Sequence, residues 1–261
     1  MPGVDGRVAL ITGAGRGIGR ATAELLASRG AKVFCVARSE RELADLGLEY
    51  AVADLGTPDG CARAVEDAEK HLGPVEIFVC NHGIGSAHER VVWEQETDTW
   101  DETMRINLDG PFHLSKLIVK GMTERGYGRV VYTSSTAGIV AEHAGSAYNS
   151  SKHGLLGLMR SVAQDGGAFG VTSNAVLPGW VRTEMAERSA AQEARDRNIT
   201  TDQVWAERAA LYPAGRVATT QEVAEVIAFL ASEESSGVSG EAIRVALGSV
   251  WSSTSRPITC Y

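Results

Sequence analysis

A tyrosine and a lysine stand four residues apart in the stretch AYNSSKHG, which covers residues 147–154. On a helix, this spacing places Tyr148 and Lys152 on one face, one turn apart. A tyrosine hydroxyl can give or take a proton, but its ordinary pKa of about 10 makes it a poor base near neutral pH. A neighbouring lysine cation favours the phenolate. The pair is therefore a candidate acid/base group, although a solvated helix face would show the same spacing.

A glycine-rich segment, TGAGRGIG at residues 12–19, follows an apolar run and opens a helical pattern. Gly13 permits a tight turn, and Gly17 and Gly19 permit close approach of the backbone to a ligand and of helix to strand. A helix that begins there presents free N–H groups and the positive end of its dipole to a phosphate. Its place between a strand and a helix favours dinucleotide binding over an ordinary glycine turn.

The elements that must position these residues follow from alternating patterns along the chain. Apolar runs typical of buried strands lie at 8–13, 32–37, 75–80, 129–134, 172–178 and 241–247, and helical patterns at 18–29, 58–72, 97–124, 148–168 and 220–232. Thr57 before Pro58 predicts one helix start, and Thr220 with Glu222 another. This alternation predicts an α/β fold: a single doubly wound Rossmann-type domain over residues 1–261, with a parallel sheet of about seven strands and helices on both faces. The charged segment 182–216 fits neither pattern and is a candidate substrate lid.

Composition narrows the possible partners. The 261 residues are 44% hydrophobic and 22% charged, with a formal net charge of -8 and no basic block, so nucleic-acid binding has no electrostatic support. No apolar run is long enough for a membrane span and no signal peptide is recognised, so we expect a cytoplasmic protein without a membrane partner. We expect Cys35, Cys61, Cys80 and Cys260 to be free thiols.

The motifs together resemble the short-chain dehydrogenase/reductase family, nearest to ketoacyl and polyketide ketoreductases and related alcohol dehydrogenases. The glycines follow T-G-x-x-x-G-x-G, Ser135 precedes Tyr148 by thirteen residues, and Tyr148 and Lys152 form Y-x-x-x-K. Asn107 in RINLDGPF matches the family's helix asparagine, and LPGWVRT at 177–183 matches its P-G-x-x-x-T segment. The resemblance covers about residues 6–247. It departs at CNHG, where Cys80 and His82 replace residues of the usual N-N-A-G, and at RVALGSVW after the last apolar run.

The resemblance implies a role for each matching residue. Tyr148 would exchange a proton with the substrate oxygen, Ser135 would hold that oxygen, Lys152 would also bind the nicotinamide ribose, and Asn107 would hold a water that links Lys152 to solvent. The nicotinamide cofactor would carry the hydride. The cofactor-binding residues would be Gly13, Gly15, Arg16, Gly17, Ile18, Gly19, Arg38, Asp54, Leu55, Asn81, Gly83, Tyr148, Lys152, Pro178, Gly179, Val181 and Thr183.

The end of the second apolar run bears on which cofactor is used. An acidic residue there would bind the ribose 2′-OH of NAD, whereas an arginine suits the 2′-phosphate of NADP. The run ends at Ala37 and is followed by Arg38 and Ser39, with Arg16 in the glycine loop as a second cation. NADP(H) is therefore the favoured cofactor, and NAD(H) stays open.

The substrate is expected to be a small ketone or secondary alcohol, and 3-oxoacyl or polyketide-type carbonyl reduction is the leading hypothesis. Two alternatives remain: an NAD-dependent sugar-alcohol or hydroxy-acid dehydrogenase that uses polar side chains of the lid, and a non-catalytic dinucleotide-binding regulatory protein. Enoyl reduction is disfavoured, because enoyl-reducing relatives space the tyrosine and lysine further apart. The candidate substrate residues are His143, Ala144, Trp180, Met185, Trp205 and Tyr212; the candidate polar lid residues are Arg182, Glu184 and Arg188.

Two further expectations concern metals and assembly. Cys80, His82 and His88 lie close in sequence but have no recognised zinc spacing, so no metal site is predicted. The family commonly forms tetramers through helices at positions that correspond to 97–124 and 148–168. The resemblance therefore implies a homotetramer, with a dimer as second choice.

Overall fold

A computed structural model describes residues 2–85 and 90–249, and within them one parallel sheet of seven strands forms the centre of the molecule. The strand order is β3-β2-β1-β4-β5-β6-β7, and every neighbouring pair is parallel. This confirms the predicted doubly wound α/β fold. The strands are β1 (Val8–Thr12), β2 (Lys32–Ala37), β3 (Glu49–Val52), β4 (Ile77–Cys80), β5 (Gly128–Thr133), β6 (Val171–Pro178) and β7 (Ala242–Val245).

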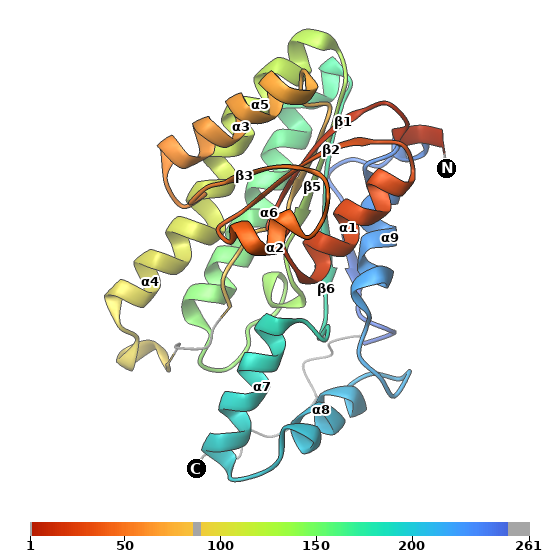
Figure 1. Ribbon diagram of the computed structural model, residues 1–261. Coiled ribbons are helices and arrows are strands. Elements are labelled where there is room, and N and C mark those ends of the chain that lie inside the picture. The colour runs from red at the N-terminus through yellow and green to blue at the C-terminus, as the bar shows by residue number, and fades with distance from the viewer. Residues whose placement is uncertain (1, 86–89, 250–261) are drawn as a thin grey trace.

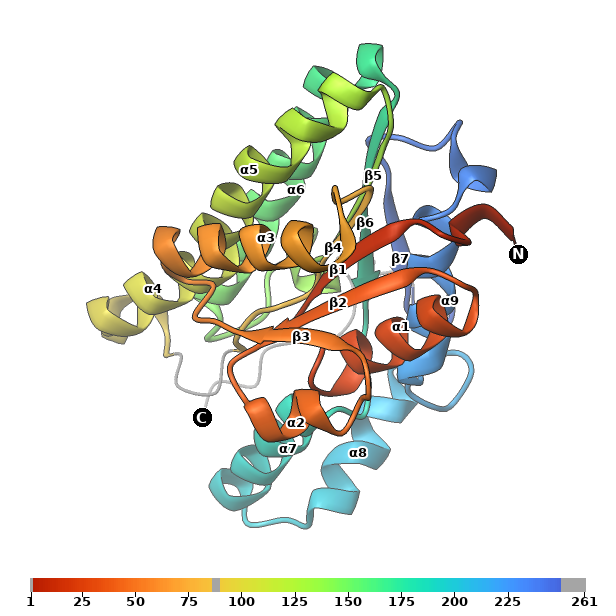
Figure 2. The same cartoon turned by 45° about the horizontal axis from the view of Figure 1, so that its top comes forward.

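Helices cover both faces of the sheet. Helices α1 and α9 pack together on one face, and α3, α5 and α6 pack side by side on the other, as Figures 1 and 2 show. The helices are α1 (Gly17–Ser28), α2 (Glu40–Ala44), α3 (Pro58–Leu72), α4 (Thr97–Met104), α5 (Gly110–Arg125), α6 (Ser146–Gly166), α7 (Glu184–Arg197), α8 (Thr201–Ala210) and α9 (Thr220–Leu230).

The strands are apolar throughout because both faces of the sheet are covered. Successive side chains of a strand point to opposite faces. In β1, Leu10 belongs to the core under α3, α5 and α6, whereas Ala9 and Ile11 belong to the core under α1 and α9. All three side chains are fully buried. The two apolar cores, one on each face, fix the sheet in place. The polar residues of the candidate site follow the carboxyl ends of its strands.

The helix boundaries agree with the sequence patterns in most places and differ in two. The side chain of Thr57 accepts a hydrogen bond from the Gly60 N–H, as expected for the start of α3. The cap of α9 lies one residue earlier than the sequence pattern predicts: Thr219, not Thr220, caps this helix, in a capping box with Glu222. The expected helix 97–124 is interrupted by a π-helical segment, η3 (Arg105–Asp109), between α4 and α5.

The segment expected as a lid contains two helices. Helices α7 and α8 pack against each other and lie at the end of the molecule beyond β6, away from the sheet layers (Figure 1). Cys35, Cys61 and Cys80 are buried free thiols, as expected, while Cys260 lies outside the described residues. A search of residues 2–85 and 90–249 finds no helix that is both long and apolar enough to cross a membrane.

Candidate functional site

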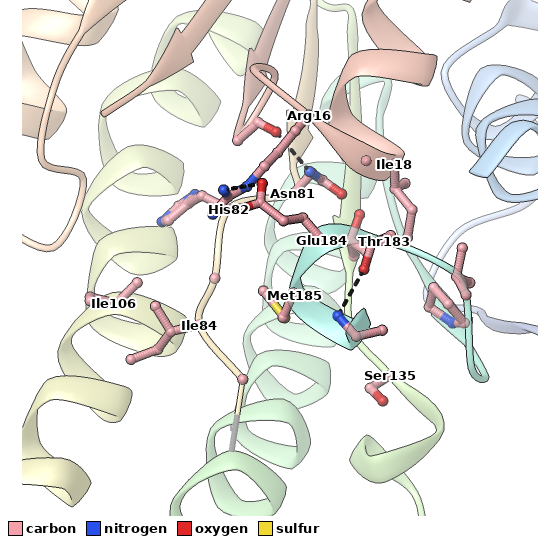
Figure 3. Close-up of a pocket in the computed structure, with 18 of the residues that line it drawn as sticks. Arg16, Ile18, Asn81, His82, Ile84, Ile106, Ser135, Thr183, Glu184 and Met185 are labelled. Carbon is pink, nitrogen blue, oxygen red and sulfur yellow. Dashed lines mark hydrogen bonds and ion pairs between the residues drawn. The ribbon is translucent and has the colours of Figure 1, made fainter. Parts of the chain in front are cut away.

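A cavity of about 420 Å³ lies at the carboxyl ends of the strands. Segments from both halves of the sheet meet there: the loop after β1, the loops after β4 and β5, and the segment after β6 (Figure 3). The strand order reverses between β1 and β4, and in doubly wound folds a ligand binds in the crevice that this reversal opens. The topology therefore places the glycine loop and the Tyr148–Lys152 pair in one cavity.

The glycine loop approaches the loop after β4 too closely for side chains. Gly13 has a φ of 65°, and a Cβ there would lie 2.9 Å from the Cα of His82. A Cβ on Gly19 would lie 2.2 Å from the Gly13 carbonyl oxygen, so the first turn of α1 packs directly on the loop. The N-cap residue Arg16 makes no side-chain cap. The N-terminus of α1 therefore offers free N–H groups to an anion.

The Thr12 hydroxyl ties the ends of β1 and β4 together. Its Oγ accepts the backbone N–H groups of Asn81 at 3.0 Å and His82 at 3.2 Å, and it lies 2.8 Å from the His82 Nδ1. The Asn81 side chain donates to the Gly13 carbonyl at 3.3 Å. Burial lowers the pKa of His82 to about 3, so its ring is neutral near pH 7. The histidine that replaces the family's alanine is part of the cavity wall, and its Nε2 lies 3.1 Å from the position of a Cβ on Gly110.

Lys152 is a buried cation beside Tyr148. Its side chain is 5% exposed, its Nζ donates to the Thr133 carbonyl at 3.1 Å, and it lies 5.6 Å from the centre of the Tyr148 ring. Burial lowers the pKa of Lys152 to about 8. The lysine is therefore still largely protonated at pH 7.

Asn107 lies behind the cavity, in the π-helical segment η3. Its Oδ1 accepts the Ile84 N–H at 2.8 Å, and its Nδ2 donates to the Ile84 carbonyl at 3.0 Å and to Ser151 Oγ at 3.2 Å. A Cβ on Gly83 would lie 3.1 Å from Asn107 Oδ1 and 3.4 Å from Lys152 Nζ. The amide therefore holds the loop after β4 close to the lysine. The extra backbone of a π-helical turn is a feature often found at functional sites.

Ser135 follows β5 and begins a short 3₁₀ helix, η4 (Thr136–Gly138). Its Oγ accepts the Ala137 N–H at 3.1 Å, which leaves the hydroxyl proton available to a ligand in the cavity. The preceding Ser134 donates to the Lys152 carbonyl at 3.1 Å and so links η4 to α6. These two bonds position Ser135 and Lys152 relative to each other.

Charged side chains border the end of the cavity near the glycine loop. Arg16 pairs with Glu184 at 2.5 Å and with Glu42 at 3.5 Å (Figure 3). Arg38 lines the cavity, is exposed, and makes no ion pair within residues 2–85 and 90–249. The Asp54 carboxylate accepts the Gly56 N–H at 3.0 Å, and this bond and the nearby Arg105 lower its pKa.

The segment after β6 forms the opposite wall. Thr183 caps α7 through the Ala186 N–H, and a Cβ on Gly17 would lie 3.2 Å from the Thr183 methyl group. The Trp180 N–H donates to the Tyr212 hydroxyl at 2.6 Å. Met185 at the start of α7 faces the loop after β4, since a Cβ on Gly85 would lie 3.2 Å from its Sδ (Figure 3). The lid segment is thus in contact with both the glycine loop and the cavity.

Most, but not all, of the residues chosen from the sequence line this cavity. Gly19 and Asn107 support it from behind, as described above. His143 is exposed and lies outside the cavity wall. Trp205 is buried behind Trp180, with the ring centres 6.5 Å apart. The chosen residues that line the cavity are Gly13, Gly15, Arg16, Gly17, Ile18, Arg38, Asp54, Leu55, Asn81, Gly83, Ser135, Tyr148, Lys152, Pro178, Gly179, Trp180, Val181, Thr183, Met185 and Tyr212.

The structure adds cavity residues that were not chosen as cofactor or substrate residues. Glu142, rather than its neighbour His143, faces the cavity, whereas Tyr212, which follows α8 and also lines the cavity, was already a candidate substrate residue. Glu42 of α2 and Ser189 of α7 also line it. Glu142 lies between Ser135 and Tyr148 in the chain, and this proximity is the one sequence signal that could have found it. Among the described residues, no group of three or more His, Cys, Asp or Glu side chains is arranged to hold a metal ion.

The donors around the cavity fit a nicotinamide dinucleotide. The glycine loop and the free N-terminus of α1 suit a pyrophosphate, because glycine removes the Cβ atoms that would fill the space. Asp54 and Leu55 lie on one side of the crevice, and Pro178, Gly179 and Val181 on the other. The buried ammonium of Lys152 lies at the inner end, beside Tyr148.

Comparison with known proteins agrees with this geometry. Residues 13–249 match the family model described as "Enoyl-(Acyl carrier protein) reductase". The chain is 34% identical over 249 residues to the 3-oxoacyl-[acyl-carrier-protein] reductase of Vibrio cholerae, covering 93% of this chain and 96% of that protein. The crystal structure of levodione reductase superposes with a TM-score of 0.89 at 31% identity, covering 93% of this chain and 96% of that one.

A second solved structure, a single-residue variant of actinorhodin polyketide ketoreductase with NADPH, superposes with a TM-score of 0.85 at 30% identity. The match covers 92% of this chain and 96% of that one. Matches of this length and identity, together with the Ser135, Tyr148 and Lys152 arrangement, leave one assignment. The chain belongs to the short-chain dehydrogenase/reductase family, whose members are oxidoreductases that act on CH–OH or C=O groups with NAD(P).

Proposed function

We propose that this protein is an NADP(H)-dependent ketone reductase that also catalyses the reverse oxidation of a secondary alcohol. The observation that carries the proposal is the presence of Ser135, Tyr148 and Lys152 in one cavity with the glycine loop. The substrate carbon that accepts the hydride, the proton donor and the cofactor can therefore all be bound in one cavity.

The reaction needs one proton at the carbonyl oxygen. When bound, the nicotinamide supplies the hydride. The Ser135 hydroxyl donates a hydrogen bond to the substrate oxygen and holds it beside Tyr148, which gives up its phenolic proton. The Lys152 cation, 5.6 Å from the ring centre, stabilises the phenolate that remains. Asn107 holds the loop after β4 against Lys152. A water beside Lys152 can then return a proton to the Tyr148 phenolate.

Two arginines support the choice of NADP(H). Arg38 is exposed at the cavity, without a carboxylate partner in the described residues, at the position where NAD-binding folds carry an acid. Arg16 lies nearby, held by Glu42 and Glu184, and a phosphate would compete with these carboxylates for it. The related actinorhodin ketoreductase was solved with NADPH.

For the substrate, we propose carbonyl reduction of the 3-oxoacyl or polyketide type. The names of the 3-oxoacyl and polyketide relatives support this, as does the four-residue spacing of Tyr148 and Lys152, which differs from that of enoyl reductases. The sugar-alcohol alternative relies on Arg182, Glu184 and Arg188. These side chains pair with carboxylates or arginines of the lid itself, Arg188 with Glu184 and Arg182 with Glu187, so they offer little to a polyol.

The test is a panel of ketones and secondary alcohols followed at the nicotinamide absorbance with both cofactors. Tyr148→Phe should lower kcat on the best substrate by a factor of about 100 or more, because the proton donor is lost. Tyr50→Phe, in β3 and outside the cavity, serves as the matched control. A wild-type protein that binds NADP(H) but turns over nothing, or a Tyr148→Phe variant of unchanged kcat, would favour the regulatory alternative.

A further inference from the structure

The cavity holds a carboxyl group that the proposed proton transfer does not use. Glu142 lies in the loop between η4 and α6, and its side chain lines the cavity. Its backbone carbonyl accepts the Asn149 side-chain N–H at 2.9 Å, which anchors the loop. Within residues 2–85 and 90–249, its carboxyl group forms no ion pair and accepts no hydrogen bond from another side chain or N–H. Burial raises the pKa of this carboxyl, and the charge of Arg208 opposes the rise.

A hydroxyl group in the wall of the same cavity, that of Tyr212, also has a proton that it can donate to a ligand. Tyr212 is 4% exposed and lines the same cavity. Its oxygen accepts the Trp180 N–H at 2.6 Å, so the phenolic proton is free to be donated, and no acceptor for it is found in the described part of the chain. Burial is the main cause of the raised pKa of Tyr212, and negative charge at Glu142 adds to it, so the two groups are within electrostatic range of each other.

An acceptor and a donor that line one cavity and act on each other electrostatically favour a ligand group that can pair with both. A hydroxyl can donate to the Glu142 carboxyl and accept from Tyr212 at once, whereas a carbonyl can only accept and an alkyl chain can do neither. An ammonium group would suit Glu142, but the buried cation of Arg208 behind the wall disfavours it. Polar groups left without partners in a half-closed pocket discriminate strongly against substrates that cannot satisfy them.

We propose that Glu142 and Tyr212 form a second polar subsite that binds a hydroxyl group of the substrate, so that the preferred substrates are hydroxyketones and the corresponding diols. This inference rests on the proposed function, because it places the reacting carbonyl at Ser135 and Tyr148. Trp180 and Met185 add apolar surface to the wall, which suits the carbon skeleton between the two oxygens.

The test compares substrates that differ in one group. Each positional isomer of hydroxycyclohexanone is assayed with NADPH against the methylcyclohexanone of the same substitution pattern, which matches it in size. For the best isomer, wild-type kcat/KM should favour the hydroxyketone by about ten-fold or more. Glu142→Leu and Tyr212→Phe should each bring this ratio close to one, mainly through KM for the hydroxyketone. Glu142→Gln, which keeps an acceptor oxygen, should restore part of it.

Controls separate this inference from the proposed function and from misfolding. Glu124→Leu, an exposed position of α5 outside the cavity, should leave the ratio unchanged. The circular dichroism spectrum of Glu142→Leu and its affinity for NADPH check that this variant is folded and binds the cofactor. If the wild type reduces both ketones equally well, or if Glu142→Leu slows both equally, the subsite is disproved while the proposed function stands. If the wild type turns over no ketone or alcohol in either direction, both fail.

Discussion

Lys152, for which we propose a catalytic role, lowers the stability of the folded protein. Its ammonium group is buried, and burial lowers its pKa from 10.5 to about 8. By linkage, a lowering of this size corresponds to about 3 kcal/mol of unfavourable free energy at neutral pH. The hydrogen bond from Lys152 to the Thr133 carbonyl offsets about 1 kcal/mol of this unfavourable free energy. A cation kept under these conditions is consistent with a functional requirement, since an apolar residue would fit there more stably.

We predict that Lys152→Met stabilises the cofactor-free protein by about 2 kcal/mol at pH 7 while abolishing turnover. Below pH 8 the lysine is charged in both the folded and the unfolded wild type, so the whole burial cost is present. Between pH 8 and pH 10.5 the folded protein loses this proton and the unfolded chain keeps it, so the cost fades. Urea unfolding of both proteins from pH 7 to pH 10.5 measures the difference. If Lys152→Met is more stable than the wild type by the same amount at every pH, or is not more stable at pH 7, then Lys152 is not a cation destabilised by burial.

At the same scale, we propose that Arg38 determines whether NADP(H) or NAD(H) is preferred. We predict that Arg38→Asp changes the ratio of kcat/KM for NADPH to that for NADH by a factor of about 100 or more in favour of NADH, because an acid there binds a ribose 2′-OH and repels a 2′-phosphate. Steady-state kinetics with both cofactors measures it. Arg41→Asp, on α2 and outside the cavity wall, controls for the change in charge. A wild-type preference for NADH would contradict the NADP(H) proposal directly.

At the scale of elements, α7 and α8 are joined by one buried arginine. Arg208 is 5% exposed, and its guanidinium lies 3.6 Å from the centre of the Trp180 ring. It donates to the Ala186 carbonyl at 3.2 Å and to Glu193 at 2.9 Å, both on α7. Trp180 is part of the cavity wall, so the packing of the two helices sets the shape of the site.

Arg208→Met should therefore loosen the lid without unfolding the sheet. The methionine keeps the apolar stem but loses the hydrogen bonds and the cation–π contact. We therefore expect the free energy of unfolding to fall by about 2 kcal/mol and the KM for the ketone to rise. Arg197→Met on α7 removes only exposed ion pairs with Glu193 and Glu207. It should lower the free energy of unfolding by about 0.5 kcal/mol or less. Denaturation monitored by tryptophan fluorescence and a KM measurement test this. If Arg208→Met and Arg197→Met change the free energy of unfolding and the KM equally, Arg208 does not join α7 to α8.

At the scale of the whole molecule, apolar side chains are exposed along α4 and α5. Trp100 and Phe112 are among them, and Trp93 just before α4 is 82% exposed. A monomeric enzyme rarely exposes a large contiguous apolar patch. Helices α4 and α5 correspond to the segment 97–124, which is one of the two helical segments through which the sequence resemblance implies assembly. We therefore propose that copies of this chain associate through α4 and α5 into a homotetramer.

We predict that light scattering finds a tetramer for the wild type and a smaller species for Phe112→Glu, because a charge buried in an interface has no partner there. Phe169→Glu, an equally apolar exposed position outside α4 and α5, should leave the mass unchanged. A wild-type monomer would contradict the proposal, as would a Phe112→Glu protein that still forms tetramers.

Local patterns were enough to predict the fold and most of the cavity. Continuous apolar runs such as 8–13 predict strands buried on both faces, and alternation with helices predicts a parallel sheet. The glycine spacing and the Tyr148–Lys152 pair could be read without a structure, because each depends on residues that are close in the chain. The π-helical interruption at 105–109 could not, because it depends on packing of Asn107 against the loop after β4.

The sequence by itself determined the order of most elements and the residues that we propose to carry the proton and hold the cofactor. The tertiary structure alone decided which side chains face the cavity. His143 and Glu142 are neighbours in a loop, and Trp205 and Tyr212 are both aromatic residues of the lid segment, yet only Glu142 and Tyr212 line the cavity. The physical reason is that a loop or a lid has no period of its own. Its side-chain directions are set by contacts with distant segments, such as the Asn149 bond to the Glu142 carbonyl and the Trp180 bond to Tyr212.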